Sequence, residues 1–207
     1  MSDKLHISAN QWRVTMLKAC VGKLVARGVA EDIADGCMAL LAAGQNPLMP
    51  LLEALDSFGP TASPPAWPTK SDTAELGSVQ VLLHGPSVID MAHAAYTCSC
   101  EIDNMPLLLG LAQARLHSHG AVLEVSADGS DWQKVRKVLR DGRALPDGGT
   151  IWLRMSGTTE PLPLKSTNLP QPKRANWAKL QAYADQIMVP ADDTNRADAG
   201  AGLTDND

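Results

Sequence analysis

One stretch of the sequence, residues 79–129, alternates between strand-like and helix-like segments, and this alternation constrains the fold more than any other feature. The pattern predicts strands at residues 79–84, 97–102 and 121–126, with helices at residues 87–96 and 106–118 between them. Alternation of this kind is typical of a mostly parallel sheet with helices packed on it. A further strand predicted at residues 150–156 leaves an α+β alternative open, in which that strand lies antiparallel at the edge of the sheet. We therefore expect an α/β fold built on a mostly parallel or mixed sheet of about four to five strands.

The segments around this core divide the chain into four predicted parts. Residues 1–59 show helical periodicity at residues 9–27, 30–43 and 47–59, and each of these stretches ends near a glycine: Gly28, Gly44 and Gly59. We expect them to form a helical subdomain packed on one side of the sheet. Residues 60–78 are predicted to be a stiff, proline-rich connector. The α/β core and a last helix at residues 174–188 then occupy residues 79–190, and an acidic tail rich in Gly and Ala occupies residues 191–207.

Charge and composition limit the classes of partner. The chain carries a net charge of −5, and its densest basic stretch, residues 134–143, is interleaved with aspartates. Binding to a phosphate backbone needs concentrated positive charge, so we expect no nucleic-acid partner, although three short helices could also form a helix-turn-helix. No apolar run is long enough to cross a bilayer, the N-terminus lacks the apolar core of a signal peptide, and the four cysteines show no disulfide-scaffold spacing. These features predict a cytoplasmic protein without a membrane partner.

Five polar residues follow or end the predicted strands: His84, Glu101, Asp103, Asn104 and Asp128. In open α/β sheets, the carboxyl ends of the strands form the edge where ligands bind. Histidine can act as an acid or base near neutral pH, and paired carboxylates can divide these roles when their environments differ. We therefore predict His84, Glu101 and Asp103 as catalytic residues. The predicted ligand-binding residues are Ser87, Asn104, Asp128 and Arg196.

Each candidate also has a structural interpretation, which the sequence leaves open. Ser87 follows a Gly-Pro pair at a predicted strand-to-helix junction, where it either caps the helix or helps free amides to bind a carboxylate or phosphate. Asp103 or Asn104 can cap the next helix, and Glu101 can face water. The junction lacks a glycine-rich fingerprint and no redox motif is present, so we expect no nucleotide and no cofactor.

Two residue pairs have the spacing of metal ligands. Cys98 with Cys100, and His117 with His119, would each point to one face if they lay in strands. We predict that His117 and His119 instead occupy the last turn of a helix, where residues two apart diverge and the helix dipole favours histidine. Cys98 and Cys100 then become small, inward-facing residues of a buried strand, and we expect no metal site.

The C-terminal tail is the most unusual part of the sequence. Residues 196–207 combine Asp, Gly and Ala in a composition typical of a disordered acidic end. In the alternative interpretation the tail is ordered, its glycines allow a close approach to another surface, and Arg196 binds a ligand carboxylate.

Four segments carry a resemblance to a known family: residues 30–36, residues 85–87 with Asp90, residues 106–109, and the tail ending in residues 200–207. On these segments the sequence resembles a bacterial family, found chiefly in proteobacteria, that is classed as a domain of unknown function. The resemblance implies that the tail is ordered and used. Two residues depart from the family pattern. Asn195 stands where the family has serine before the arginine, and Asp198 stands where the family has glycine.

Two classes of function follow from these observations. The first is a small enzyme of hydrolase or lyase type that acts on a carboxylate or amino-acid-like metabolite at the carboxyl ends of the strands. The second is a non-catalytic binding or accessory subunit that docks a partner through its tail or its helical subdomain. We expect a small-molecule ligand in the first case, and the sequence is compatible with a homo-oligomer in both.

Overall fold

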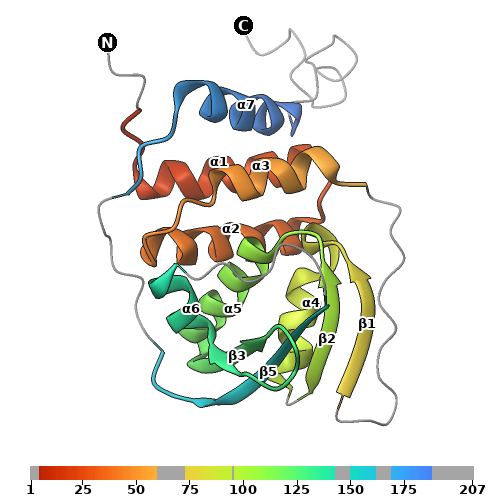
Figure 1. Ribbon diagram of the computed structural model, residues 1–207. Helices are drawn as coiled ribbons and strands as arrows, with labels where there is room; N and C mark the ends of the chain where they lie inside the picture. The colour runs from red at the N-terminus through yellow and green to blue at the C-terminus, as the bar shows by residue number, and fades with distance from the viewer. Residues whose placement is uncertain (1–4, 60–72, 95, 143–149, 162–168, 188–207) are drawn as a thin grey trace, which may run out of the picture.

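The protein is built on a mixed five-stranded sheet with helices packed on one face (Figure 1). The computed structural model describes residues 5–59, 73–94, 96–142, 150–161 and 169–187. The strands are β1 (Thr73–Val79), β2 (Thr97–Ile102), β3 (Ala121–Ser126), β4 (Gln133–Lys134) and β5 (Thr150–Thr158). The helices are α1 (Ala9–Gly22), α2 (Arg27–Ala42), α3 (Leu48–Ser57), α4 (Val81–His93), α5 (Met105–His119), α6 (Val135–Asp141), α7 (Arg174–Ala184) and the 3-10 helix η1 (Asp185–Ile187). The predicted α/β class is confirmed.

The strand order β1-β2-β5-β3-β4 brings together segments that are far apart in the sequence. β1 pairs with β2 in parallel, whereas β5 runs antiparallel to both neighbours, with Leu153 opposite Cys98 on β2 and Val125 on β3. β2 and β3 are therefore parallel to each other with β5 between them, as in a split βαβ unit. The prediction of a mixed sheet is confirmed. In the α+β alternative, the antiparallel orientation of the strand at residues 150–156 is correct, but its position at the edge of the sheet is wrong.

Alternation along the strands decides which face of the sheet is buried. Cys98 and Leu153 belong to the face covered by α4 and α5, and both are at most 1% exposed. The opposite face carries Glu124 and Arg154, whose side chains form an ion pair at 3.0 Å. The guanidinium of Arg154 also lies 4.0 Å from the ring centroid of Trp132. The sheet therefore has one apolar face and one polar face.

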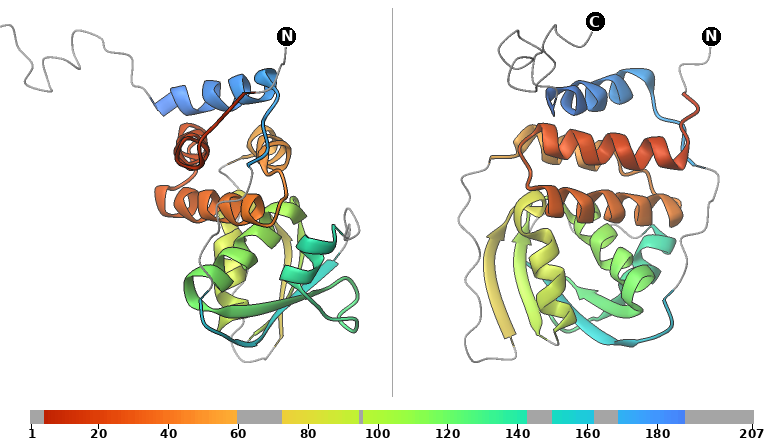
Figure 2. Two further views of the ribbon diagram at one scale, coloured as in Figure 1. Left: turned by 90° about the vertical axis from the view of Figure 1, so that its left-hand side faces the viewer. Right: turned by 180° about the vertical axis from the view of Figure 1, so that it is seen from behind.

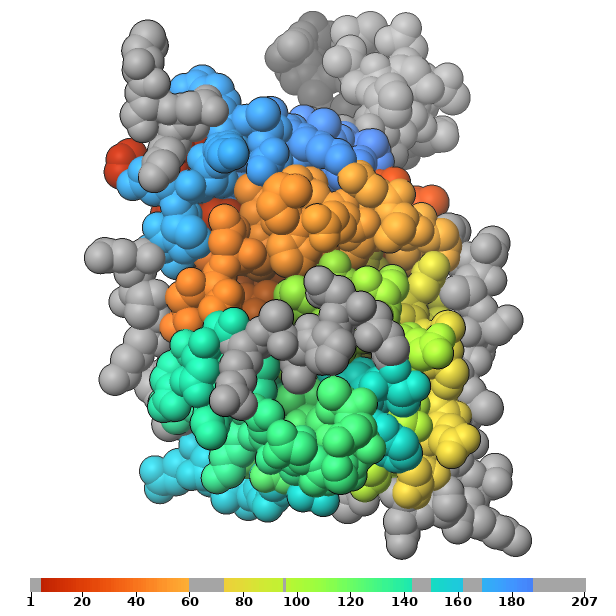
Figure 3. Space-filling model, in the orientation of Figure 1, coloured from red at the N-terminus to blue at the C-terminus, as the bar shows by residue number. Residues whose placement is uncertain are grey.

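The N-terminal helices pack mainly on other helices, and α2 and α3 contact α4 and α5 (Figure 1). α2 lies against α5, and the two backbones meet where Gly36 faces Gly110. A Cβ atom placed on Gly110 would lie 2.6 Å from the carbonyl oxygen of Gly36. The predicted contact of the helical subdomain with one side of the sheet is thus indirect, because α4 and α5 lie between them. The space-filling view shows the same layering, with orange N-terminal helices above the green and yellow α/β core (Figure 3).

α1, α3 and α7 form the layers farthest from the sheet (Figure 2). Trp12 of α1 and Trp177 of α7 meet edge to face, with ring centroids 5.0 Å apart. Asp56 of α3 accepts hydrogen bonds from Lys179, at 2.5 Å, and from Tyr183, which both belong to α7. These contacts attach the last helix to the N-terminal ones, and the predicted helix at residues 174–188 is confirmed as α7 with η1.

α1 begins as its sequence predicts but ends earlier. The amide of Ser8 donates to the Gln11 side chain and the Gln11 amide donates to Ser8 Oγ, which completes a capping box. The predicted stop at Gly28 is wrong: α1 ends at Gly22, and Gly28 lies inside α2. Leu24 takes the left-handed conformation instead, with φ +66°, and its amide bonds to the Val21 carbonyl in a Schellman-type turn.

The predicted strand at residues 79–84 is also wrong, because α4 begins at Val81. β1 starts earlier, at Thr73, inside the segment predicted as connector, and ends at Val79. Pro86 lies in the second turn of α4, where proline removes only one backbone hydrogen bond near the start of the helix. A cap from outside the helix compensates: Asp103, which follows β2, accepts a hydrogen bond from the Val81 amide.

Two further predictions concern the second half of the chain and the membrane. Periodicity alone does not distinguish a helix from a twisted strand at residues 132–140. In the structure, this stretch contains the short β4 followed by α6. Among the described residues, no helix has the length and apolar character needed to cross a membrane. The cytoplasmic location stays a prediction.

Candidate functional site

The carboxyl ends of β1, β2 and β3 lie along the same edge of the sheet, as expected for parallel strands. Asp103 and Asn104 follow β2, and Asp128 follows β3. Because β5 lies between β2 and β3, these two strands are separated by about 10 Å, twice the usual strand spacing. The carboxylates of Asp103 and Asp128 therefore do not form one compact pair.

Asp103 acts as a cap for α4. Its Oδ1 accepts a hydrogen bond from the Val81 amide at 2.8 Å, and its own amide donates to the Val79 carbonyl at 3.2 Å. Burial raises the pKa of this carboxyl group above its ordinary value, against the opposing effect of backbone hydrogen bonds and of nearby His84. A carboxylate in this position joins the end of β2 to the start of α4.

Asn104 and Glu101 have the structural roles given as alternatives above: Asn104 caps the next helix and Glu101 faces water. Asn104 Oδ1 accepts from the Leu107 amide at 3.2 Å, which caps α5, and its Nδ2 donates to the Pro50 carbonyl at 2.8 Å. Both polar ends of this buried amide are therefore satisfied by protein groups. Glu101 is exposed and accepts a hydrogen bond from Ser78 Oγ at 3.2 Å. The structure therefore gives Asn104 and Glu101 partners within the protein.

Asp128 organises the turn after β3. Its Oδ1 accepts from the amides of Ser130, at 2.8 Å, and Asp131, at 3.0 Å, and from Ser126 Oγ at 2.9 Å. These hydrogen bonds hold the pKa of Asp128 well below its ordinary value, although the group is exposed. Turns of this kind are a common structural role of aspartate.

His84 and Ser87 lie within α4 and not at a strand end. His84 is only 6% exposed, and its Nδ1 has no hydrogen-bond partner among the described residues. Burial lowers the pKa of His84, while the neighbouring Asp103 carboxylate opposes that effect. Ser87 is half-buried in the middle of the helix, so the predicted capping role is wrong. Arg196 lies outside the described residues.

The two pairs with metal-ligand spacing behave as the helix interpretation predicted. His117 and His119 lie in the last turn of α5, where the first donates through Nδ1 to the Gln113 carbonyl and the second stacks on His93. Cys98 and Cys100 are buried in β2. Burial raises the pKa of the Cys98 thiol to about 11 and that of Cys100 to about 12. Within the described ranges, no group of three or more His, Cys, Asp or Glu residues could hold a metal ion.

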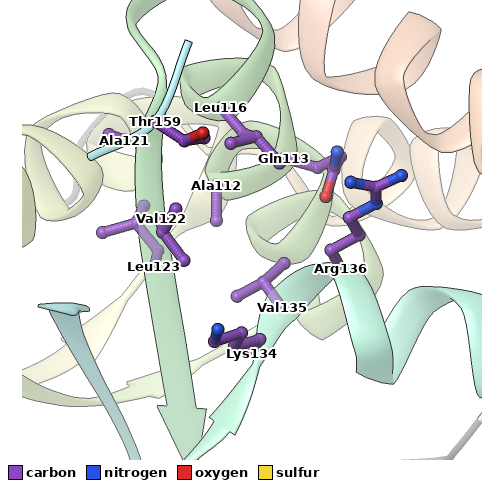
Figure 4. A pocket seen from close by; sticks show the side chains of 10 residues that line it. All are labelled: Ala112, Gln113, Leu116, Ala121, Val122, Leu123, Lys134, Val135, Arg136 and Thr159. Carbon is purple, nitrogen blue, oxygen red and sulfur yellow. The ribbon is translucent and has the colours of Figure 1, made fainter. Parts of the chain in front are cut away.

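A cavity of about 300 Å³ lies away from the strand edge, between α5, β3 and the start of α6 (Figure 4). Its lining comes from four segments of the chain: Ala112, Gln113 and Leu116; Ala121, Val122 and Leu123; Lys134, Val135 and Arg136; and Thr159. The volume falls at the lower end of the range seen for small-molecule sites, which are mostly apolar with a few polar groups. This lining follows that pattern.

The polar groups of the cavity are an amide, a hydroxyl and two cations. Gln113 is only 6% exposed, and Figure 4 shows its side-chain amide beside the guanidinium of Arg136. Arg136 and Lys134 are both exposed and form no ion pair with another described residue. No acidic side chain is among the ten lining residues, in a chain whose net charge is −5. The cavity is thus locally cationic.

No motif in the sequence predicts this cavity. Residues 134–143 are the densest basic stretch of the sequence, but the aspartates among them argue against a nucleic-acid site and indicate no other ligand. One signal was present: the apolar Val135 separates two cations just where β4 gives way to α6. The contribution of α5 could not be read from the sequence, because Gln113 lies within an otherwise apolar helix face.

Comparison with protein-family models, with curated proteins and with solved structures finds no match to the chain. The resemblance to a proteobacterial family therefore stays a prediction, as do the enzymatic role of the strand edge and the docking of a partner by the tail or the helical subdomain.

Proposed function

We propose that the protein binds a small organic anion in the cavity between α5, β3 and α6. The observation that carries this proposal is the composition of the lining, where two cations and a buried amide surround an apolar space without any acidic side chain. Guanidinium groups bind carboxylates through paired, charge-assisted hydrogen bonds. Apolar walls from Leu116, Leu123 and Val135 would accommodate the carbon skeleton of the same ligand.

The polar side chains at the strand edge already form hydrogen bonds within the protein, and this favours ligand binding in the cavity over catalysis at that edge. Asp103, Asn104 and Asp128 all accept hydrogen bonds from backbone amides, so their loss would disturb helix or turn formation. The side chains at this edge thus already have structural roles in the protein. In the cavity, by contrast, Arg136 and Lys134 have no ion-pair partner among the described residues to displace.

Thermal denaturation with a panel of small carboxylic acids tests the proposal, because a ligand that binds only the folded state stabilises it. At a concentration of 100 times its Kd, a ligand adds about 2.7 kcal/mol. For a chain of this size, that should raise Tm by about 5–10 °C. We expect at least one acid to do so with the wild-type protein and to lose most of its effect with Arg136→Met.

Lys137→Met is the matched control, because Lys137 is an exposed cation of α6 outside the cavity lining. It removes the same charge as Arg136→Met and should leave the thermal shift unchanged. The proposal would be wrong if no acid stabilised the wild type, or if both variants responded to the acid as the wild type does.

A further inference from the structure

The two cations of the cavity lie at different ends of it. Lys134 precedes the helix with extended backbone, at φ −61° and ψ 128°, and Val135 is the first residue of α6. Val135 is 2% exposed and its side chain lies between the other two, with Lys134 toward β3 and Arg136 toward Gln113 (Figure 4). A single small anionic group therefore meets one cation or the other, while the apolar Val135 occupies the space between them.

From this arrangement we infer that the ligand is a dicarboxylate with a short apolar linker, an inference that rests on the proposed function. One carboxylate binds Arg136 and the side-chain NH₂ of Gln113, and the other binds the ammonium group of Lys134. The methylene groups between them lie over Val135, opposite Ala112 and Leu116. An acid with one carboxylate satisfies only one end and leaves the other cation without a partner.

The arginine end is the more specific of the two. Arg136 supplies a planar fork of donors that matches a carboxylate, and the adjacent Gln113 amide is held in place by its burial. Lys134 supplies a compact charge on a flexible stem, which tolerates variation in the position of the second carboxylate. Linkers of somewhat different length are therefore accepted, whereas loss of the carboxylate at the arginine end is not.

Isothermal titration calorimetry on the full chain separates this inference from the proposed function. The probes are linear dicarboxylates with about four to six carbons, which are small enough for a cavity of about 300 Å³. The monocarboxylates of the same lengths are tested beside them. We expect the best dicarboxylate to bind about tenfold more tightly than its monocarboxylate counterpart, as one added charge-assisted contact implies. Lys134→Met should abolish this advantage and change the monocarboxylate affinity by less than about twofold.

Arg136→Met should weaken both classes of acid by about tenfold or more, and the Lys137→Met control should change neither. Equal affinity of the wild type for both classes, or an undiminished dicarboxylate advantage in Lys134→Met, would overturn the inference while leaving anion binding in place. Absence of binding by both classes would instead overturn the proposed function. Lys134, Arg136 and Lys137 are all exposed, so thermal denaturation without ligand should show that each variant folds as the wild type does.

Discussion

Replacement of Gly110 by alanine tests the contact that attaches the N-terminal helices to the α/β core. Alanine is favoured over glycine inside a helix by about 1 kcal/mol, so the intrinsic effect of Gly110→Ala is stabilising. The new Cβ, however, would lie 2.6 Å from the Gly36 carbonyl oxygen and 2.9 Å from Leu40 Cγ. α2 and α5 would have to separate by roughly 0.5–1 Å, and overpacking of this kind costs about 1–3 kcal/mol.

Gly28→Ala is the matched control for this substitution. Gly28 is also helical, in α2, but a Cβ placed on it would meet nothing within 4 Å. It should stabilise the protein by up to about 1 kcal/mol, whereas Gly110→Ala should destabilise it by about 1 kcal/mol. With a urea m-value of about 2 kcal/mol/M, the midpoints of the two variants should differ by about 1 M. Equal midpoints would show that α2 and α5 are not in backbone contact at Gly110.

Two other substitutions test local features of the chain. Leu24 is 77% exposed with φ +66°, so Leu24→Gly should raise the free energy of unfolding by about 1 kcal/mol, and a lower midpoint in urea would contradict the assigned turn. Asp103→Ala should lower it by about 1 kcal/mol through loss of the cap of α4, whereas Asp103→Asn keeps an acceptor for the Val81 amide. The folded-state pKa of Asp103 is raised above 3.8, so the folded state binds its proton more tightly than the unfolded state does. The stability gained from this tighter proton binding is fully present below pH 3.8 and is lost as the pH rises through the folded-state pKa. Urea titrations from pH 4 to 7 should therefore show the wild type losing stability relative to Asp103→Asn, and a constant difference would contradict the raised pKa.

Local signals in the sequence were sufficient for several elements. The strands at residues 97–102 and 121–126 were predicted with the bounds that the structure has, because apolar runs and turn residues mark both ends. The cap of α5 was predicted as an alternative role of Asn104, because Asn followed by Pro106 two residues later is a common start of a helix. These features depend on residues that are close together in the chain.

The errors arose where distant residues decide the local structure. α4 begins at Val81, where the cap comes from Asp103, 22 residues later in the chain. No residue next to Val81 in the sequence indicates that a helix starts there. β5 lies in the centre of the sheet because it pairs with strands about 30 and 50 residues earlier, which periodicity does not encode. Leu24 takes a conformation that sequence rules assign to glycine, so the predicted end of α1 moved to Gly28.

The candidate site illustrates the same limit. The residues at the strand edge were found from the sequence because strand ends are predictable, yet most of them have structural partners. The cavity joins residues from four segments, and none of these segments has a recognisable motif by itself. Its polar groups form a candidate binding site only in the folded protein, where α5 and α6 place Gln113 beside Arg136.

Nuclear magnetic resonance of the ¹⁵N-labelled protein during titration with a dicarboxylate tests the central claim most directly. The side-chain NH₂ signals of Gln113 and the Nε–H signal of Arg136 should shift in a saturable way, together with the backbone amides of residues 134–136. The amides of Asp103, which follows β2, and of His84, near the start of α4, should not move. Saturable shifts at His84 and Asp103 without shifts at Gln113 would contradict the account and would place the ligand at the carboxyl ends of the strands.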